Sequence, residues 1–147
     1  MAIRIIIEEN VEIEEEKVII LCKKLSKKLM KAIDLLKSKD TLIVYKSSAM
    51  HKIDVESIYY FESVEKKLFV YTDNEVYESK DKLTAIEQEM NEDFIRISRT
   101  MIVNWQKIES LKPILNGRLE ARLDNEERLI ISRQYVTELK KRFVYGQ

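Results

Sequence analysis

Apolar and polar positions follow two different periods in the first forty residues. Residues 2–9 are rich in isoleucine, a β-branched residue that favours a strand. Glutamates at 14–16 suit the start of a helix and lysines at 37 and 39 suit its end, because of the helix dipole. Between them, residues at spacings of four and three predict an amphipathic helix with a heptad stripe, here called the seam: Val18, Cys22, Leu25, Leu29, Ala32 and Leu36.

Two partners for this helix are open. The seam can pack on the chain's own sheet, or it can pair with a second copy of the chain. It covers fewer than the ~3–4 heptads typical of a coiled coil, and Cys22 and Ala32 are small. We expect residues 1–40 to form a dimer interface, because a strand and a helix placed ahead of a complete domain need a surface to pack against.

After a short polar break at residues 38–40 the period becomes that of strands. Short apolar runs are separated by turn residues, and Asn116-Gly117 is the strongest turn signal, typical of a type I′ hairpin with positive φ at both residues. Asp73-Asn74 predicts a second hairpin. The expected strands span residues 41–46, 57–62, 68–72, 75–78, 94–97, 101–103, 107–111, 118–123 and 129–131.

Two short helices interrupt these strands. Ser79 can cap the first, which would run to about Asn91, and Ser132 can cap the second. The residues expected to point inward are Leu83, Ile86 and Met90 in the first helix, and Val136, Leu139 and Phe143 in the second. The pattern therefore predicts a mainly β (α+β) domain over residues 41–147, with about ten short antiparallel strands, behind the N-terminal strand and helix.

Composition makes an enzyme the weakest hypothesis. His51 is the single histidine, so no histidine pair can hold a metal and no Ser–His relay is available. Cys22 lies on the apolar seam and reads as a packing residue. No phosphate-binding loop or dinucleotide fingerprint occurs. We expect no catalytic residue, no cofactor, no metal site and no small-molecule substrate.

Cysteine content and hydropathy bear on location. A single cysteine excludes an internal disulfide and fits a reducing compartment. The sequence contains neither a signal-peptide pattern nor an apolar run long enough to span a bilayer. We therefore expect a cytoplasmic protein.

Charge is balanced in total but not along the chain. The 26 basic and 26 acidic side chains sum to zero. Residues 41–93 hold six bases and twelve acids, whereas residues 94–147 hold eleven bases and six acids, a local charge of +5. A polyanion responds to such a patch rather than to the sum. Charge alone is equally compatible with chance clustering on a solvated surface.

Motifs in three separated segments bear on this question. The first is Ile58-Tyr59-Tyr60-Phe61-Glu62-Ser63. The second is Phe94-x-Arg96-x-x-Arg99-x-x-Ile102-Val103-Asn104, followed by Ile108. The third is Leu129-Ile130-Ile131-Ser132-Arg133-x-Tyr135. In this order, from about Lys46 to Phe143, the sequence resembles the LytTR family of bacterial DNA-binding domains. The resemblance implies an elongated arrangement of antiparallel sheets that reads direct-repeat DNA sites with loops, usually as a homodimer.

The resemblance also implies site residues. Asn104 matches the family's base-contacting asparagine, since an Asn amide can pair with adenine. Arg133 and the loop residues Lys66 and Lys67 are further candidates for base contact. The candidates for contact with the DNA backbone are Arg96, Ser98, Arg99, Thr100 and Ser132. Each of these residues has a simpler alternative as a turn residue or a solvated charge.

The sequence departs from the family in two ways. The family often has His or Asn at the position of Ser98, Ser at that of Thr100 and an aromatic residue at that of Met101, which puts the fine sequence preference in doubt. The receiver domain of the family's response regulators has no counterpart, because no phosphoacceptor pattern precedes residue 40. Similar receiver-less members often work beside a membrane protein that restrains them, and we expect such a partner here.

The sequence thus supports two hypotheses of different classes. The first is a transcriptional regulator that binds double-stranded DNA sequence-specifically. The second is a β-rich interaction or sensor module whose basic last third binds an acidic protein or a single-stranded nucleic acid. A wide gap between affinity for a specific site and for random duplex DNA, on the order of 10³, distinguishes the first from the second.

Overall fold

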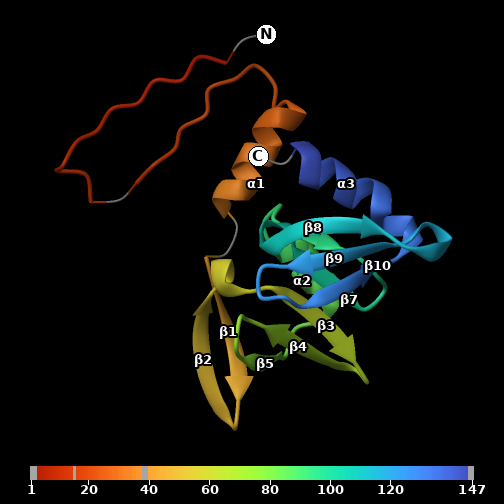
Figure 1. The fold of residues 1–147 in the computed structure, drawn as a ribbon. Helices are drawn as coiled ribbons and strands as arrows, with labels where there is room; N and C mark the ends of the chain where they lie inside the picture. Colours follow the sequence, from red (N-terminus) through yellow and green to blue (C-terminus); the bar gives the residue numbers. More distant parts are fainter. Residues whose placement is uncertain (1–2, 15, 38–39, 146–147) are drawn as a thin grey trace.

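The computed structural model describes residues 3–14, 16–37 and 40–145. Over these ranges the chain is mainly β, as predicted, with ten strands and three α-helices (Figure 1). The helices are α1 (Lys27–Lys37), α2 (Leu83–Glu89) and α3 (Val136–Tyr145). The strands are β1 (Thr41–Lys46), β2 (Ala49–Asp54), β3 (Tyr60–Val64), β4 (Lys67–Tyr71), β5 (Val76–Ser79), β6 (Phe94–Arg96), β7 (Met101–Asn104), β8 (Ile108–Pro113), β9 (Leu119–Leu123) and β10 (Arg128–Ile131).

The described strands form two antiparallel sheets. One has seven strands in the order β2-β1-β5-β4-β3-β7-β6, and the other has three in the order β10-β9-β8. Tight turns with positive φ at two successive residues join several neighbours, since such turns match the twist of the strands. Asn116 and Gly117, with φ of 67° and 73°, confirm the turn that the sequence predicts most strongly. Glu65 and Lys66, with φ of 49° and 68°, form another between β3 and β4.

Alternation along the strands builds two cores from one sheet. Neighbouring residues on a strand point to opposite faces, so Tyr60 and Phe61 belong to different buried clusters, as do Val103 and Ile102. On one face of the seven-stranded sheet, Phe61 and Ile102 pack with Ile86 of α2. On the other, residues of the three-stranded sheet and α3 pack against Tyr60 and Val103. The small sheet and α3 are thereby fixed to the large sheet.

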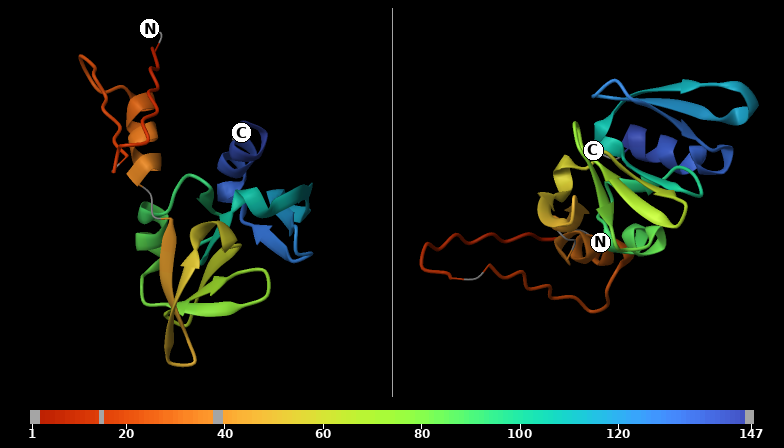
Figure 2. Two further views of the ribbon diagram at one scale, coloured as in Figure 1. Left: turned by 90° about the vertical axis from the view of Figure 1, so that its left-hand side faces the viewer. Right: turned by 90° about the horizontal axis from the view of Figure 1, so that it is seen from below.

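The N-terminal prediction is wrong in two respects. Residues 3–9 form no strand, and Ile5, Ile6 and Ile7 are 76–79% exposed. A strand needs a partner for its backbone N–H and C=O groups, and no other described segment pairs with this one. The segment projects from the domain in Figures 1 and 2.

The first helix begins later than the seam predicts. α1 starts at Lys27, after Ser26, whose hydroxyl accepts the N–H of Leu29 at 3.2 Å as an N-cap. Val18, Cys22 and Leu25 lie before it in a stretch without helix or strand, so only Leu29, Ala32 and Leu36 of the seam are helical. The preceding Val18-Ile19-Ile20 run is β-branched and disfavours a helix.

Within the domain the differences from the prediction are small. β2 was not expected, because its residues are mostly exposed and show no alternation of buried positions. His51 lies on this strand, beside the ring of Tyr77. Ser79 does not cap α2; it ends β5, and its hydroxyl accepts the N–H of Asp81. Ser132 stands at the N-cap position of a 3-10 turn over Arg133–Tyr135, but its side chain makes no capping hydrogen bond there. This turn leads into α3, where Leu139 is buried as predicted.

Candidate nucleic-acid interface

Three segments from both sheets meet at one end of the domain. They are the β3–β4 turn, the loop between β6 and β7, and the chain that leaves β10. The backbone N–H of Ser63 donates to the carbonyl of Thr100 at 2.8 Å, and that of Ser132 donates to the carbonyl of Ile97 at 2.9 Å. These bonds hold the segments together. We call residues 64–67, 97–100 and 132–134 the loop face; it lies on the side away from the N-terminal segment (Figures 1 and 2).

Four cationic side chains stand exposed on the loop face. Lys66 and Lys67 lie at the β3–β4 turn, Arg99 at the tip of the β6–β7 loop, and Arg133 at the start of the 3-10 turn. None of them forms an ion pair with another residue of the described chain, whereas Arg122, Arg128 and Arg142 each pair with a glutamate at 2.9–3.6 Å. Unneutralised cations on a rigid surface create a local attraction for anions.

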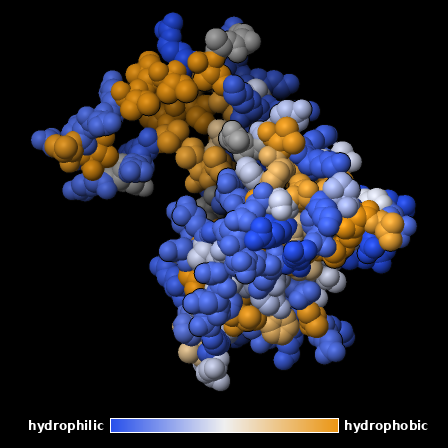
Figure 3. Space-filling model, in the orientation of Figure 1, coloured by the Kyte–Doolittle hydropathy of each residue, from blue (hydrophilic) through white to orange (hydrophobic). Residues whose placement is uncertain are grey.

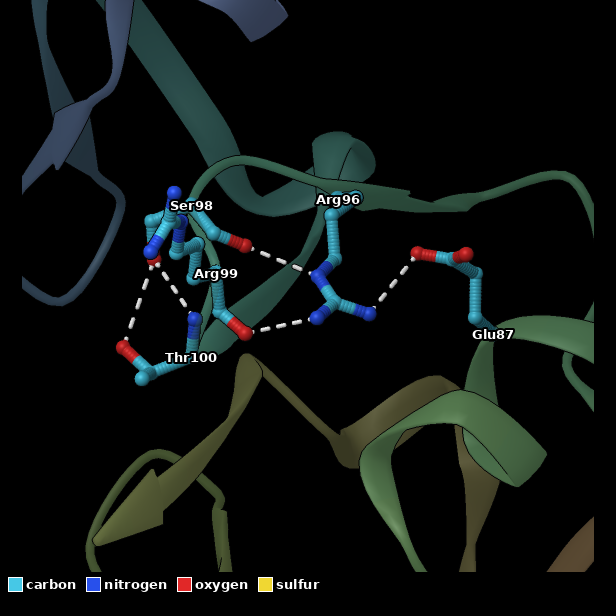
Figure 4. A network of polar contacts seen from close by, with 5 residues as sticks. All are labelled: Glu87, Arg96, Ser98, Arg99 and Thr100. Carbon is cyan, nitrogen blue, oxygen red and sulfur yellow. Dashed lines mark hydrogen bonds and ion pairs between the residues drawn. The ribbon is translucent and has the colours of Figure 1, made fainter.

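Hydroxyl groups lie among these cations. A shallow pocket is lined by residues of two of the segments: Ser98, Arg99, Thr100, Ser132, Arg133 and Gln134. The Ser98 hydroxyl accepts the backbone N–H of Thr100 at 3.2 Å, which tightens the loop (Figure 4). Five of the nine residues predicted to contact DNA line this pocket, and Lys66 and Lys67 lie on the same loop face. The structure therefore brings seven of the nine to one face. Gln134, which also lines the pocket, carries no signal in the sequence that would have singled it out.

Arg133 is supported by a turn that is distant in sequence. A Cβ placed on Gly117 would lie 2.9 Å from Cδ and 3.1 Å from Cγ of Arg133. The aliphatic stem of Arg133 therefore packs on the backbone of the Asn116–Gly117 turn, where φ of Gly117 is +73°. Glycine suits this position, because it adopts a left-handed backbone readily and because any added Cβ would make the arginine stem shift. The sequence shows the turn but not the residue that rests on it.

Asn104 does not fit the role of base reader. It is only 3% exposed at the end of β7. Its Nδ2 donates to the carbonyl of Ile58 at 3.0 Å and its Oδ1 accepts the N–H of Gln106 at 3.1 Å. Both ends of the amide are thus used inside the protein, where they cap the 3-10 turn Trp105–Lys107 and join it to the chain before β3.

Arg96 is also unsuited to its predicted role as a phosphate contact. Its Nε donates to the carbonyl of Ser98 at 2.8 Å and its Nη2 to the carbonyl of Arg99 at 2.6 Å. Its Nη1 lies 3.0 Å from Oε2 of Glu87, and the side chain is 20% exposed. Every nitrogen of this guanidinium has a partner within the chain, so little of it remains for DNA.

The seam residues are mostly at the surface. Val18, Leu25 and Leu36 are 49–66% exposed, and Cys22 is a free, exposed cysteine. Leu29 and Ile33 of α1 are half-buried, whereas Ala32 is exposed. This exposure leaves the seam available to a second chain, and the dimer stays a prediction.

The described residues form a mainly β protein of two antiparallel sheets, whose exposed cations Lys66, Lys67, Arg99 and Arg133 lie in or beside the turns and loops between elements. A family model described as the LytTr DNA-binding domain matches residues 48–144. The chain belongs to the LytTR family and carries a LytTr DNA-binding domain. A solved structure described as the LytTr DNA-binding domain of a protein from Bacillus cereus is similar in fold, with a TM-score of 0.67, 23% identity, and coverage of 74% of this chain and 99% of that one.

Curated relatives extend beyond the matched domain. A protein of Staphylococcus aureus described as an uncharacterized HTH-type transcriptional regulator is 30% identical over 114 residues, 78% of each chain. The sensory transduction protein LytT of Enterococcus faecalis is 28% identical over 135 residues, which are 88% of this chain. This chain spans only about half the length of LytT, since the match covers 56% of that protein. No helix in the described ranges is long and apolar enough to cross a membrane.

Proposed function

We propose that this protein is a transcriptional regulator that binds double-stranded DNA sequence-specifically through its loop face. The observation that carries the proposal is the convergence of Lys66, Lys67, Arg99 and Arg133 on loops fixed to both sheets. The described relatives named as transcriptional regulators support the same class. The proposed location is the cytoplasm, where the DNA of a bacterium lies.

The residues divide between positioning and reading. Arg99 and the hydroxyls of Ser98, Thr100 and Ser132 suit phosphate oxygens, which orient a protein on the duplex without specifying sequence. Arg133 suits guanine, whose O6 and N7 accept a guanidinium in a bidentate pair. The β3–β4 hairpin carries Lys66 and Lys67, and a major groove about 12 Å wide admits a two-stranded ribbon. We do not propose Asn104 as a base contact, because its side chain is buried.

Binding as a homodimer to tandem sites completes the proposal. The exposed seam residues Val18, Leu25 and Leu36 support a second copy as the partner of this region. Two linked loop faces would bind two repeats with higher avidity than one. A membrane protein that restrains the regulator stays a prediction from the family resemblance.

The test is an unbiased selection with the full chain. The protein is incubated with a random-sequence duplex pool, and bound molecules are recovered and sequenced over several rounds. We expect a motif that occurs twice in the same orientation, and an affinity for it on the order of 10³ above that for random duplex. A pool without an enriched motif, combined with equal or tighter binding of single-stranded DNA or polyglutamate, would show an interaction module instead.

The salt dependence of binding tests the role of Arg99. Replacing Arg99 with Ala should weaken binding to specific and random duplexes alike, and should reduce the slope of log affinity against log salt by about one. Arg128→Ala is the matched control, because Arg128 is exposed but already paired with Glu120 at 2.9 Å. Equal slopes for wild type and Arg99→Ala would remove Arg99 from the phosphate contacts.

A further inference from the structure

We propose that Arg96 is a positioning residue for DNA binding: it clamps the β6–β7 loop from within and touches no DNA itself. The effect of this clamp on DNA binding rests on the proposed function. The clamp consists of Arg96, the carbonyls of Ser98 and Arg99, and Glu87 on α2 (Figure 4).

The geometry of the clamp needs a guanidinium. Nε and Nη2 reach two successive carbonyls at 2.8 and 2.6 Å, while Nη1 reaches the Glu87 carboxylate at 3.0 Å. A planar fork with fixed donors meets three acceptors in different directions at once, and an ammonium cannot reproduce that arrangement. Each bond involves a charged donor, so each is stronger than a neutral hydrogen bond.

The clamp decides which atoms of the loop face the ligand. Backbone carbonyls carry partial negative charge, and carbonyls directed at a phosphate would repel it. In Figure 4 the carbonyls of Ser98 and Arg99 point to Arg96. The pocket is then lined by the residues of the same loop together with Arg133. Arg96 therefore removes two acceptors from the DNA side and leaves the donors there.

Glu87 fixes the other side of the guanidinium. It lies on α2, whose Ile86 is fully buried in the core, so the carboxylate is tied to a packed element rather than to the loop. Residues 94–96 form β6, paired with β7, which holds the Cα of Arg96 in place. The side chain of Arg96 thereby connects the β6–β7 loop to α2, and its backbone connects the loop to the sheet.

Substitutions distinguish a clamp from a phosphate contact. Arg96→Lys keeps the charge but loses the fork, so affinity of the full chain for its selected duplex should fall about tenfold, the equivalent of one charge-assisted hydrogen bond. The salt slope on random duplex should stay unchanged. Glu87→Ala should weaken selected binding in the same direction. The matched controls are Arg142→Ala and Glu92→Ala, which break an ion pair of 3.2 Å at similar exposure away from the loop face.

A direct contact with phosphate predicts the opposite results. Arg96→Lys would then bind like wild type, Arg96→Ala would flatten the salt slope by about one, and Glu87→Ala would tighten binding by removing a nearby negative charge. Any of these three outcomes overturns the clamp. Thermal unfolding of each variant shows whether a loss of binding merely follows a loss of folded protein.

A measurement without DNA separates this proposal from the proposed function. In the free protein, hydrogen exchange at the backbone amides of Ser98 and Thr100 should accelerate about tenfold in Arg96→Lys. The same amides should be unaffected in Arg142→Ala. Unchanged exchange in Arg96→Lys refutes the clamp even where DNA binding is confirmed. Accelerated exchange supports the clamp even where the selection finds no motif.

Discussion

The loop face and the N-terminal segment are both exposed, but they expose opposite chemistry. The loop face is tied to both sheets by hydrogen bonds and presents cations such as Arg99 and Arg133. The N-terminal segment, residues 3–25, has no helix or strand over its described part and presents apolar side chains. Ile5 is 76% exposed and Leu21 is 92% exposed. Figure 3 shows hydrophobic surface gathered at the upper left, over the N-terminal part of the chain.

This difference indicates what each region requires. Exposed charge is solvated and needs no partner to be stable, so the loop face is complete before it meets a ligand. A large exposed apolar patch is unusual on a monomer and marks an interaction site. The first region is held in place before any anion binds, whereas we expect the second to become ordered only when it packs against another protein surface. Substitutions in the two regions should accordingly affect different measurements.

The largest effect is expected at the seam. Leu36 is 62% exposed near the end of α1, so Leu36→Lys should hardly change the stability of a monomer, and a base suits the end of a helix. If the seam joins two copies, the charge separates them. Affinity for a duplex with two sites should fall by about 10²–10⁴ while affinity for one site is retained. Sedimentation equilibrium checks the mass.

Met30→Lys provides the control for this prediction. Met30 is 52% exposed on the same helix but lies off the seam. A protein that stays dimeric as Leu36→Lys, or that dissociates equally as Met30→Lys, has its dimer interface elsewhere.

The next largest effect is expected on the loop face. Arg133→Ala should reduce the affinity for the selected duplex by about 1–3 kcal/mol and relax the preference at one base pair. Gly117→Ala should act in the same direction, because the added Cβ displaces the arginine stem and strains a residue with φ of +73°. Selection repeated with each variant measures both changes. Unaltered base preference in Arg133→Ala would assign the arginine to phosphate.

Local patterns in the sequence predicted much of the domain. Alternation along Leu119, Ala121 and Leu123 gave a strand with one buried face, which the structure confirms. The Asn-Gly turn before it formed as expected. Arg99 and Arg133 were named as candidates from motifs, and the structure brings them to one pocket. The strand and the turn follow from residues that are close together in the chain. The two arginines follow from the order of the family motifs along the chain.

Features that depend on distant partners could not be predicted. Asn104 is of a residue type that can read a base, but it is buried and its Nδ2 donates to the carbonyl of Ile58, 46 residues away. Arg96 has the right charge to contact phosphate, but Glu87 and two loop carbonyls occupy it. The seam has the right spacing for a long helix, but the described chain offers no surface to cover its first half, and a helix without packing is marginal.

A smaller effect is expected for a substitution of Asn104, and it should change the stability of the fold rather than the recognition of bases. Asn104→Ala leaves the buried N–H and carbonyl partners of the amide unsatisfied and should lower the free energy of unfolding by about 1–3 kcal/mol. The ratio of affinities for selected and random duplex should stay constant. Urea denaturation and titration measure the two quantities. Gln106→Ala, at an exposed neighbouring position, should change neither. If Asn104→Ala had normal stability but a reduced preference for the selected duplex, Asn104 would be a base contact after all.

The smallest effect is expected at high pH, where the joint between the two sheets weakens. Tyr59 donates its hydroxyl to Asp124 in the β9–β10 turn, and burial, with this bond, raises the pKa of Tyr59. Burial and the neighbouring Glu127 raise the pKa of Tyr60. Both tyrosines connect the large sheet, which carries Lys66 and Arg99, to the small sheet, which leads to Arg133.

The sign of the pH effect follows from the raised pKa values. An unfolded tyrosine loses its proton near pH 10, whereas the folded tyrosines keep theirs, so the native state binds more protons above that pH. Stability is therefore complete below about pH 10 and falls as the pH rises further. Urea denaturation between pH 8 and 11 should show a shallower decline for Tyr60→Phe than for wild type. Tyr145→Phe, at a site 82% exposed, should decline like wild type. Equal declines in all three proteins would mean that the contact between the two sheets does not depend on the protonated hydroxyl of Tyr60.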